Sequence, residues 1–251
     1  MTKTDRPVAL ITGSATGVGR ACVLRFAKNG YRVVVNYSRS ADDAHRTLAE
    51  VREHDPDARL IQCDVSDETS VREMIATIDQ QFGRLDVLVN NAATTNFIAH
   101  EDLESLTEPM WDRMLAVNLK GPFFVTRAAA SLLKAGAGGS VVNVSSIAGK
   151  LGSGSSIAYC ASKAGLNTMT ISLARVLAPK VRVNAVCPGL IDSRWIRKSN
   201  SNWDLDAMVS EYPIPRASSP DDIADAVWFL ATGTGMTTGQ LLNVDGGQTI
   251  A

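Results

Sequence analysis

The sequence has little of what a metal site, nucleic acid binding or a membrane span requires. Its four cysteines, at positions 22, 63, 160 and 187, show no close pairing and no metal-ligand spacing, and its three histidines form no ligand motif. We therefore expect no metal site, and cysteines that are reduced and buried in a cytoplasmic protein. The net charge of -1 at pH 7 predicts no general attraction to nucleic acid or to an anionic membrane.

Long hydrophobic runs are also lacking. The longest weakly polar stretch, 121–133, contains Arg127 and is too short to span a bilayer. Residues 1–7 are polar and lead into a predicted strand, so no signal peptide is expected. The 251 residues are 45% hydrophobic and 20% charged, which is typical of an ordinary soluble globular protein, and the length suits one large core, with two small ones as the alternative.

Short apolar segments alternate with longer amphipathic segments along the chain. The short segments are rich in β-branched residues, as in a parallel sheet that is covered on both faces. Seven strands are predicted, at 8–11, 32–36, 59–62, 85–89, 141–144, 181–186 and 241–244. Helices are predicted at 17–28, 40–53, 67–81, 107–134, 156–178 and 220–232. The pattern predicts a single-domain α/β protein of Rossmann type, with a doubly wound seven-stranded parallel sheet and helices on both faces.

One connection, 190–217, is long for this alternation. It carries Trp195, Trp203, Met208 and Tyr212. A long segment with aromatic side chains beside a sheet is typical of a lid, so we interpret 190–217 as a candidate substrate lid. Ordinary packing against the sheet is the alternative.

A glycine-rich turn joins the first predicted strand to the first predicted helix. Its spacing is Gly-x-x-x-Gly-x-Gly. Glycines let the backbone turn sharply and approach a pyrophosphate, and the helix N-terminus offers free N–H groups to it. The turn therefore predicts a dinucleotide site. The predicted cofactor-binding residues of this turn are Gly13, Ser14, Thr16, Gly17, Val18 and Gly19.

The end of the second predicted strand bears on the choice of cofactor. An acid there would bind the adenosine ribose 2′-hydroxyl and favour NAD, but the chain has Asn36. Tyr37, Ser38 and Arg39 follow, and the arginine can pair with a 2′-phosphate. We expect NADP(H). NAD(H) stays open, because Thr16 occupies a turn position where a second basic residue would strengthen the case.

Tyr159 and Lys163 are four residues apart, which places them on one face of a helix. An ammonium group beside a phenol stabilises the phenolate, so we expect the pKa of Tyr159 to be lowered. Ser146, thirteen residues before the tyrosine, supplies a hydroxyl to the same oxygen. Such a tyrosine can exchange a proton with an alcohol or a carbonyl.

In combination these motifs resemble the short-chain dehydrogenase/reductase family, in order and at normal spacing from Thr12 to Gly247. The segment 90–93, Asn-Asn-Ala-Ala, resembles the family's Asn-Asn-Ala-Gly, with Ala93 in place of the usual glycine. Ser193 stands where threonine is common and keeps the hydroxyl. The resemblance extends the predicted cofactor site to Asp64, Val65, Asn91, Ala92, Ala93, Tyr159, Lys163, Pro188, Gly189, Ile191 and Ser193.

The family's catalytic tetrad maps onto Asn118, Ser146, Tyr159 and Lys163. The resemblance implies that Tyr159 exchanges the proton while Ser146 positions the substrate oxygen. It implies that Lys163 binds the nicotinamide ribose and that Asn118, in the predicted helix 107–134, holds a water linking Lys163 to solvent. A purely structural role is the alternative for each of the four residues, for instance a helix kink at Asn118.

The predicted function is an NADP(H)-dependent oxidoreductase that interconverts a carbonyl and a secondary alcohol, with Tyr159 as the general acid/base. An NAD(H)-dependent sugar, polyol or small-alcohol dehydrogenase is the alternative. A non-catalytic dinucleotide-binding sensor is a remote alternative. Such relatives usually lose the tyrosine or the lysine, whereas this chain has both Tyr159 and Lys163.

Within the family the chain most resembles the 3-oxoacyl carrier-protein reductases and the sugar or polyol dehydrogenases close to them. Carrier-protein reductases tend to have basic residues before the fifth strand, whereas this chain has Ala-Gly-Ala-Gly-Gly at 135–139 and only Lys134 nearby. We therefore favour a small ketone, sugar or polyol over a carrier-protein thioester. The resemblance also implies a homotetramer, with helices 107–134 and 156–178 pairing across one two-fold axis and strand 240–244 across another.

Overall fold

The computed structural model describes residues 6–199 and 203–251. Its centre is one sheet of seven parallel strands in the order β3-β2-β1-β4-β5-β6-β7. The strands are β1 Val8–Ile11, β2 Arg32–Tyr37, β3 Arg59–Gln62, β4 Val87–Asn90, β5 Gly139–Val144, β6 Val181–Pro188 and β7 Leu241–Val244. The predicted fold class is confirmed, and all seven predicted strands are present with small shifts at their ends.

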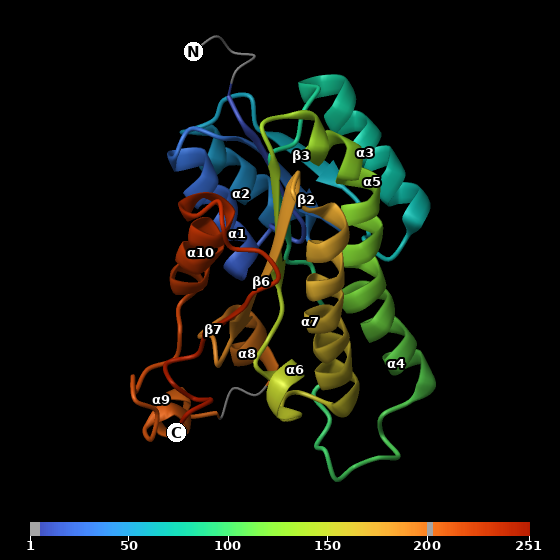
Figure 1. Ribbon diagram of the computed structural model, residues 1–251. Coiled ribbons are helices and arrows are strands. Elements are labelled where there is room, and N and C mark those ends of the chain that lie inside the picture. The colour runs from blue at the N-terminus through green and yellow to red at the C-terminus, as the bar shows by residue number, and fades with distance from the viewer. Residues whose placement is uncertain (1–5, 200–202) are drawn as a thin grey trace.

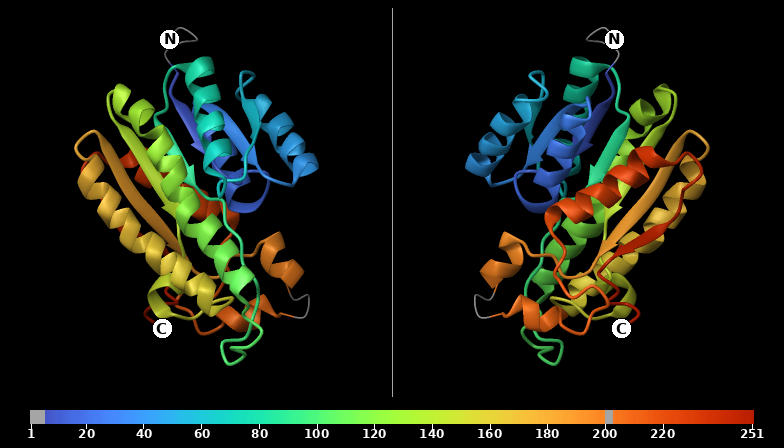
Figure 2. Two further views of the ribbon diagram at one scale, coloured as in Figure 1. Left: turned by 90° about the vertical axis from the view of Figure 1, so that its right-hand side faces the viewer. Right: turned by 90° about the vertical axis from the view of Figure 1, so that its left-hand side faces the viewer.

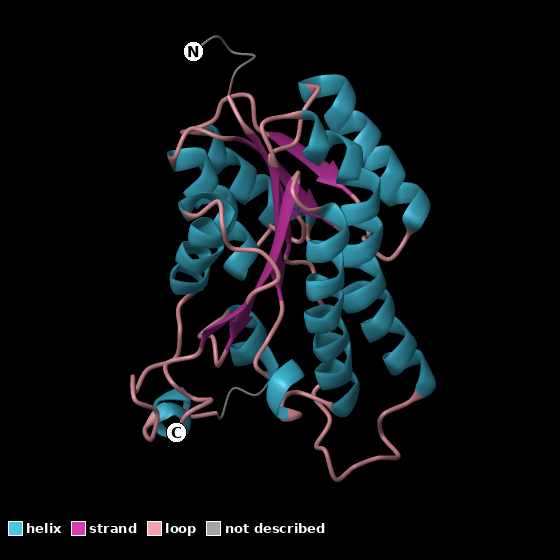
Figure 3. Cartoon of the chain, viewed as in Figure 1, coloured by secondary structure: helices cyan, strands magenta, loops and turns pink. Residues whose placement is uncertain are grey.

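Helices cover both faces of the sheet (Figures 1 and 3). One face carries α1, α2 and α10, and the other carries α3, α5 and α7, with α4 continuing along the line of α5 (Figure 2). The α-helices are α1 Gly17–Lys28, α2 Ala41–Arg52, α3 Glu68–Phe82, α4 Glu108–Leu115, α5 Gly121–Ala135, α6 Ala148–Leu151, α7 Ile157–Leu177, α8 Arg194–Ser199, α9 Leu205–Val209 and α10 Pro220–Trp228.

Alternate residues of the central strands supply two separate hydrophobic cores. Ala9 and Ile11 of β1 pack with Phe26 of α1 on one face. Val8 and Leu10 point to the other face, among side chains of α3 and α5. Because side chains of a strand alternate between faces, a continuous apolar run is the pattern that a doubly covered sheet needs.

The predicted helix 107–134 is not continuous. It consists of α4, a π-helical turn η1 Ala116–Lys120, and α5. Pro122 has no N–H, so the α-helical hydrogen bond to the carbonyl of Asn118 cannot form, and the helix widens at this point. The predicted helix 220–232 is likewise divided. Its α-helical part, α10, ends at Trp228, and a second π-helical turn, η2 Phe229–Gly233, follows.

The connection 190–217 contains two short helices, α8 and α9, rather than only loop. A single bridge, Ile191 to Ser218, closes its base. The predicted lid thus leaves the carboxyl end of β6 and returns to the start of α10. Residues 200–202 lie outside the described residues.

The four cysteines are buried free thiols. Within residues 6–199 and 203–251, no cluster of three histidine, cysteine or acidic side chains could hold a metal ion. Over the same residues, no helix combines the length and the apolar character that a membrane span needs.

Candidate active site

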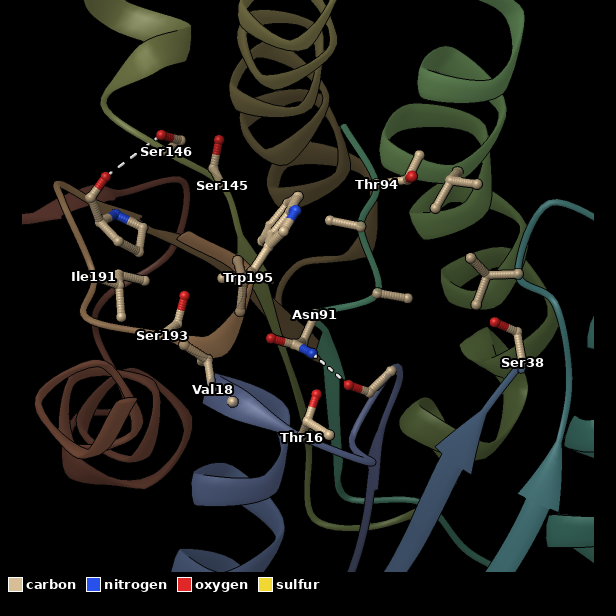
Figure 4. A pocket seen from close by; sticks show the side chains of 18 of the residues that line it. Thr16, Val18, Ser38, Asn91, Thr94, Ser145, Ser146, Ile191, Ser193 and Trp195 are labelled. Carbon is tan, nitrogen blue, oxygen red and sulfur yellow. Dashed lines mark hydrogen bonds between the residues drawn. The ribbon is translucent and has the colours of Figure 1, made fainter. Parts of the chain in front are cut away.

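A cavity of about 500 Å³ follows the carboxyl ends of the strands, from β3 on one side to β6 on the other. It lies where strand order reverses between β1 and β4, which is where ligands bind in open α/β sheets. Figure 4 shows Thr16, Ser38, Asn91 and Ser193 around it, with the indole of Trp195 projecting into it. The predicted residues that line the cavity are Gly13, Thr16, Gly17, Val18, Ser38, Arg39, Asp64, Val65, Asn91, Ala92, Ala93, Ser146, Tyr159, Lys163, Pro188, Gly189, Ile191 and Ser193.

The glycine turn is shaped for close approach to this cavity. Gly17 has φ +57°, which side chains disfavour, and open space beyond its Cα. Gly13 has φ +62°, and a Cβ there would stand 2.8 Å from the Cα of Ala92. Gly13 is therefore required for the turn to lie against the β4 loop, whereas Gly17 is favoured by its φ alone.

Four predicted residues do not line the cavity, namely Ser14, Gly19, Tyr37 and Asn118. Ser14 is fully buried, and its Oγ donates to the carbonyl of Ile11 at 2.8 Å. A Cβ on Gly19 would lie 2.6 Å from the side-chain nitrogen of Asn91. Both residues hold the turn in place from behind, so the structure supports a positioning role for them.

Asn36 ties the glycine turn to the sheet. Its Oδ1 accepts from the backbone N–H of Gly13 at 2.9 Å, and its Nδ2 donates to the carbonyls of Ile61 and Cys63 at 3.2 Å. An aspartate could not donate to those two carbonyls. These hydrogen bonds explain why position 36 is an asparagine, whichever cofactor the protein binds.

Several cavity residues were not predicted as site residues. They are Asn36, Cys63, Thr94, Arg113, Val117, Val144, Ser145, Arg194 and Trp195. Arg194 and Trp195 directly follow the predicted Ser193, so their position beside a motif was a usable signal. Arg113 comes from α4, and no sequence spacing relates it to the strand ends.

Arg113 holds the loop after β3. Its guanidinium donates to Asp64 and to the Oγ of Ser66, each at 2.8 Å. Burial raises the pKa of Asp64, but hydrogen bonds from Ser66 and Arg113 outweigh it, so the net pKa lies below the ordinary value. Asp64 is thus an ionised acceptor held at the edge of the cavity.

Tyr159 and Ser146 meet where the cavity reaches β5 and α7. Burial raises the pKa of Tyr159 to about 12, and a hydrogen bond with the Ser146 side chain lowers it only in part. The expectation of a lowered tyrosine pKa is therefore wrong for this arrangement, because burial of the phenol outweighs the groups around it. At neutral pH the phenol carries its proton.

Lys163 lies on the same helix but is directed at the sheet. Its Nζ donates to the carbonyl of Val144 at 2.8 Å and stands 5.7 Å from the centre of the Tyr159 ring. The side chain is 2% exposed, and burial lowers its pKa to about 8. The ammonium is thus costly to keep charged, which is typical of a lysine held for chemistry.

Asn118 lies in the π-helical turn and is fully buried. Its side chain accepts from the N–H of Thr94 at 2.8 Å and donates to the carbonyl of the same residue at 2.9 Å. It also donates to the Oγ of Ser162, at 3.1 Å. Asn118 therefore fixes the loop after β4 against α7, and its side chain does not reach the cavity.

A second cavity of about 670 Å³ opens beside the first and shares Ser146, Tyr159 and Trp195 with it. Its walls come from the loop after β4, the turn around α6 and the segments 189–196 and 203–212. The edge-on pair Phe97 and Trp203 forms one side, and among the described residues no lysine, arginine, aspartate or glutamate lines the cavity. Volume and lining suit an uncharged, largely apolar ligand.

The chain has a Rossmann-type fold with two joined cavities that meet at Ser146 and Tyr159. The model of the family described as "Enoyl-(Acyl carrier protein) reductase" matches residues 13–249. The chain therefore belongs to the short-chain dehydrogenase/reductase family, as its motifs indicated.

Two curated relatives and one solved structure illustrate the similarity. A protein of Streptomyces violaceoruber, named as ketoacyl reductase 2 of the granaticin polyketide synthase, is 45% identical over 97% of this chain and 96% of its own. The 3-oxoacyl-[acyl-carrier-protein] reductase FabG of Staphylococcus aureus is 37% identical over 95% of this chain and 96% of its own. The structure titled "ElxO with NADP Bound" has a TM-score of 0.90 and 31% identity, covering 98% of this chain and 100% of that one.

Proposed function

We propose that this protein is an NADP(H)-dependent reductase of ketones, with Tyr159 as the proton donor. The observation that carries the proposal is the meeting of the two cavities at Tyr159 and Ser146. One cavity has the form of a dinucleotide site, and the other has the form of a site for an apolar ligand. A carbonyl placed at their junction would contact both hydroxyls.

The first cavity fits a dinucleotide. Gly17 faces it without a side chain, and the N-terminus of α1 opens onto it, which suits a pyrophosphate. The Arg39 guanidinium lies at the adenosine side with no hydrogen bond or ion pair to any described residue. A cation left unpaired beside Ser38 supports binding of a 2′-phosphate, and hence NADP(H) over NAD(H).

The chain's own residues supply the acid chemistry. When bound, NADPH supplies the hydride. Ser146 and Tyr159 then donate hydrogen bonds to the carbonyl oxygen, where negative charge develops, and Tyr159 gives up its proton. Because the pKa of Tyr159 is about 12, the phenol is protonated over the whole neutral range, which suits the reductive direction. Lys163 places a positive charge behind this site.

The second cavity bears on the substrate. Its apolar and aromatic side chains, among them Phe97, Trp195 and Trp203, offer a surface to a ligand larger and less polar than a sugar or polyol, which supports an acyl or polyketide-type ketone. The names of the two relatives support the same class. The segment 190–217, with Trp195 and Trp203 on this cavity, would act as its lid.

The test is oxidation of NADPH or NADH with an acetoacetyl thioester, a bicyclic aryl ketone and a small sugar or diketone panel. Turnover of a ketone with NADPH, and a loss of about 10²- to 10⁴-fold in Tyr159→Phe, is expected. Because the phenylalanine ring keeps the shape of the cavity wall, cofactor affinity should fall far less than turnover in that variant. Equal turnover in Tyr159→Phe would refute the assigned acid, and a preference for NADH would refute the role of Arg39.

The proposed assembly is the homotetramer of the family resemblance, in a cytoplasmic protein. Two features support contacts with further subunits, namely the exposed Phe123 beside Arg127 on α5 and the partly exposed strand β7. Light scattering during size-exclusion chromatography gives the mass directly, and a monomer would exclude this proposal.

A further inference from the structure

Arg194 is the first residue of α8 and lines the dinucleotide cavity. Its guanidinium makes a two-point ion pair with Asp43 in the first turn of α2, at 2.6 and 3.3 Å. The two residues are 151 positions apart in the chain. The pair therefore joins the predicted lid to the adenosine side of the cleft. It places the Arg194 guanidinium where a phosphate of the dinucleotide could reach it.

Asp43 does not depend on Arg194 for its charge to be balanced. Arg46, one turn further along α2, pairs with the same carboxylate. Hydrogen bonds from both arginines, with that of Arg194 the larger, lower the pKa of Asp43 to about 2. If Arg194 moves to another anion, the carboxylate keeps a partner.

The other two arginines that line the cavity leave one phosphate group of a dinucleotide without a basic partner. Arg113 is fixed by Asp64 and Ser66, and Arg39 stands alone at the adenosine side. A bound NADP(H) would bring a pyrophosphate and a 2′-phosphate into a cavity whose glycine turn has Thr16 where a basic side chain would help. A guanidinium pairs with a phosphate by the same two-point geometry that it uses with a carboxylate.

We propose that Arg194 binds a phosphate group of the dinucleotide, and that Asp43 holds its guanidinium beside the cleft until the cofactor arrives. This inference rests on the proposed use of NADP(H) but concerns a residue outside the family motifs described above. It makes Arg194 a cofactor-binding residue that the lid carries, so that binding of the cofactor and placement of α8 are coupled.

The experiment measures the affinity of the full chain for NADPH and for NADH by titration calorimetry, without substrate. The variant is Arg194→Gln, and the matched control is Arg197→Gln. Arg197 lies on the same helix, makes a two-point pair with Asp192 at 2.6 Å for both contacts, and does not line the cavity. Binding is measured independently of turnover. If the native chain binds neither cofactor, the proposed function fails, whatever the variant does.

A loss of about tenfold in affinity is expected for Arg194→Gln and none for the control. A loss confined to NADPH assigns the 2′-phosphate as the partner, and an equal loss for both cofactors assigns the pyrophosphate; either supports the proposal. Unchanged affinity for both cofactors, or an equal loss in Arg197→Gln, overturns it and leaves a surface ion pair.

A second variant tests the part played by Asp43. Asp43→Asn frees Arg194, so NADPH should bind a few-fold more tightly in an otherwise native chain. In the Arg194→Gln background the same change should have no such effect, because the group that it frees is gone. An equal gain in both backgrounds would show that Asp43 acts only through its own charge, and would overturn the proposed competition.

Discussion

Replacement of Lys163 by methionine should make the protein more stable while removing its activity. The side chain is 2% exposed, and burial lowers its pKa from 10.5 to about 8. At about 1.4 kcal/mol per pKa unit, keeping the ammonium charged at pH 7 costs the folded state about 3 kcal/mol. Methionine has a similar length, favours helices and carries no charge.

The gain is partly offset by a lost hydrogen bond. The Nζ of Lys163 donates to the carbonyl of Val144 at 2.8 Å, and leaving that carbonyl unpaired costs about 1 to 2 kcal/mol. Lys163→Met should therefore gain about 1 to 2 kcal/mol at pH 7, which is a rise in Tm of about 2 to 8 °C for a chain of this size.

The sign of the pH dependence follows from the lowered pKa of Lys163. Between pH 8 and 10.5 the folded state has released the proton and the unfolded state still binds it, so the stability of the native sequence rises with pH across this window. The advantage of Lys163→Met should thus be greatest below pH 8 and should disappear towards pH 10.5.

The assay is urea unfolding of the cofactor-free protein at pH 7 and pH 9.5, with Lys134→Met as the control. Lys134 is exposed on α5, so its replacement should change the free energy of unfolding by less than about 0.5 kcal/mol at either pH. A variant of Lys163 that is less stable than the native chain at pH 7, or a difference that is the same at both pH values, would refute the reasoning.

Three further changes test the site. Ser146→Ala should lower turnover about 10- to 100-fold and move the ionisation of Tyr159 to still higher pH, because the Ser146 hydrogen bond lowers that pKa; ultraviolet titration of the phenol checks this. Arg39→Gln should weaken NADPH about tenfold and leave NADH unchanged, and an equal change for both would contradict the assignment. Gly13→Ala, with its Cβ 2.8 Å from the Cα of Ala92, should cost more than about 1 kcal/mol and weaken cofactor binding, as seen by thermal unfolding and titration.

Local sequence determined most of the architecture. The β-branched runs predicted all seven strands, because a strand covered on both faces is apolar along its whole length. The glycine turn was found from spacing alone, since glycine adopts the φ of +62° and +57° at Gly13 and Gly17 without the strain that a side chain would add. The i, i+4 spacing that places Tyr159 and Lys163 on one helix face is likewise local, and both residues line the cavity.

The tertiary structure decided what depends on burial and on contacts between distant segments. The pKa of Tyr159 is raised rather than lowered, because the phenol is desolvated by residues from other elements. Arg113 reaches the cavity from α4, a helix whose sequence gives no sign of it. The ion pair between Arg194 and Asp43 joins positions 151 residues apart, and only the folded chain brings such positions together.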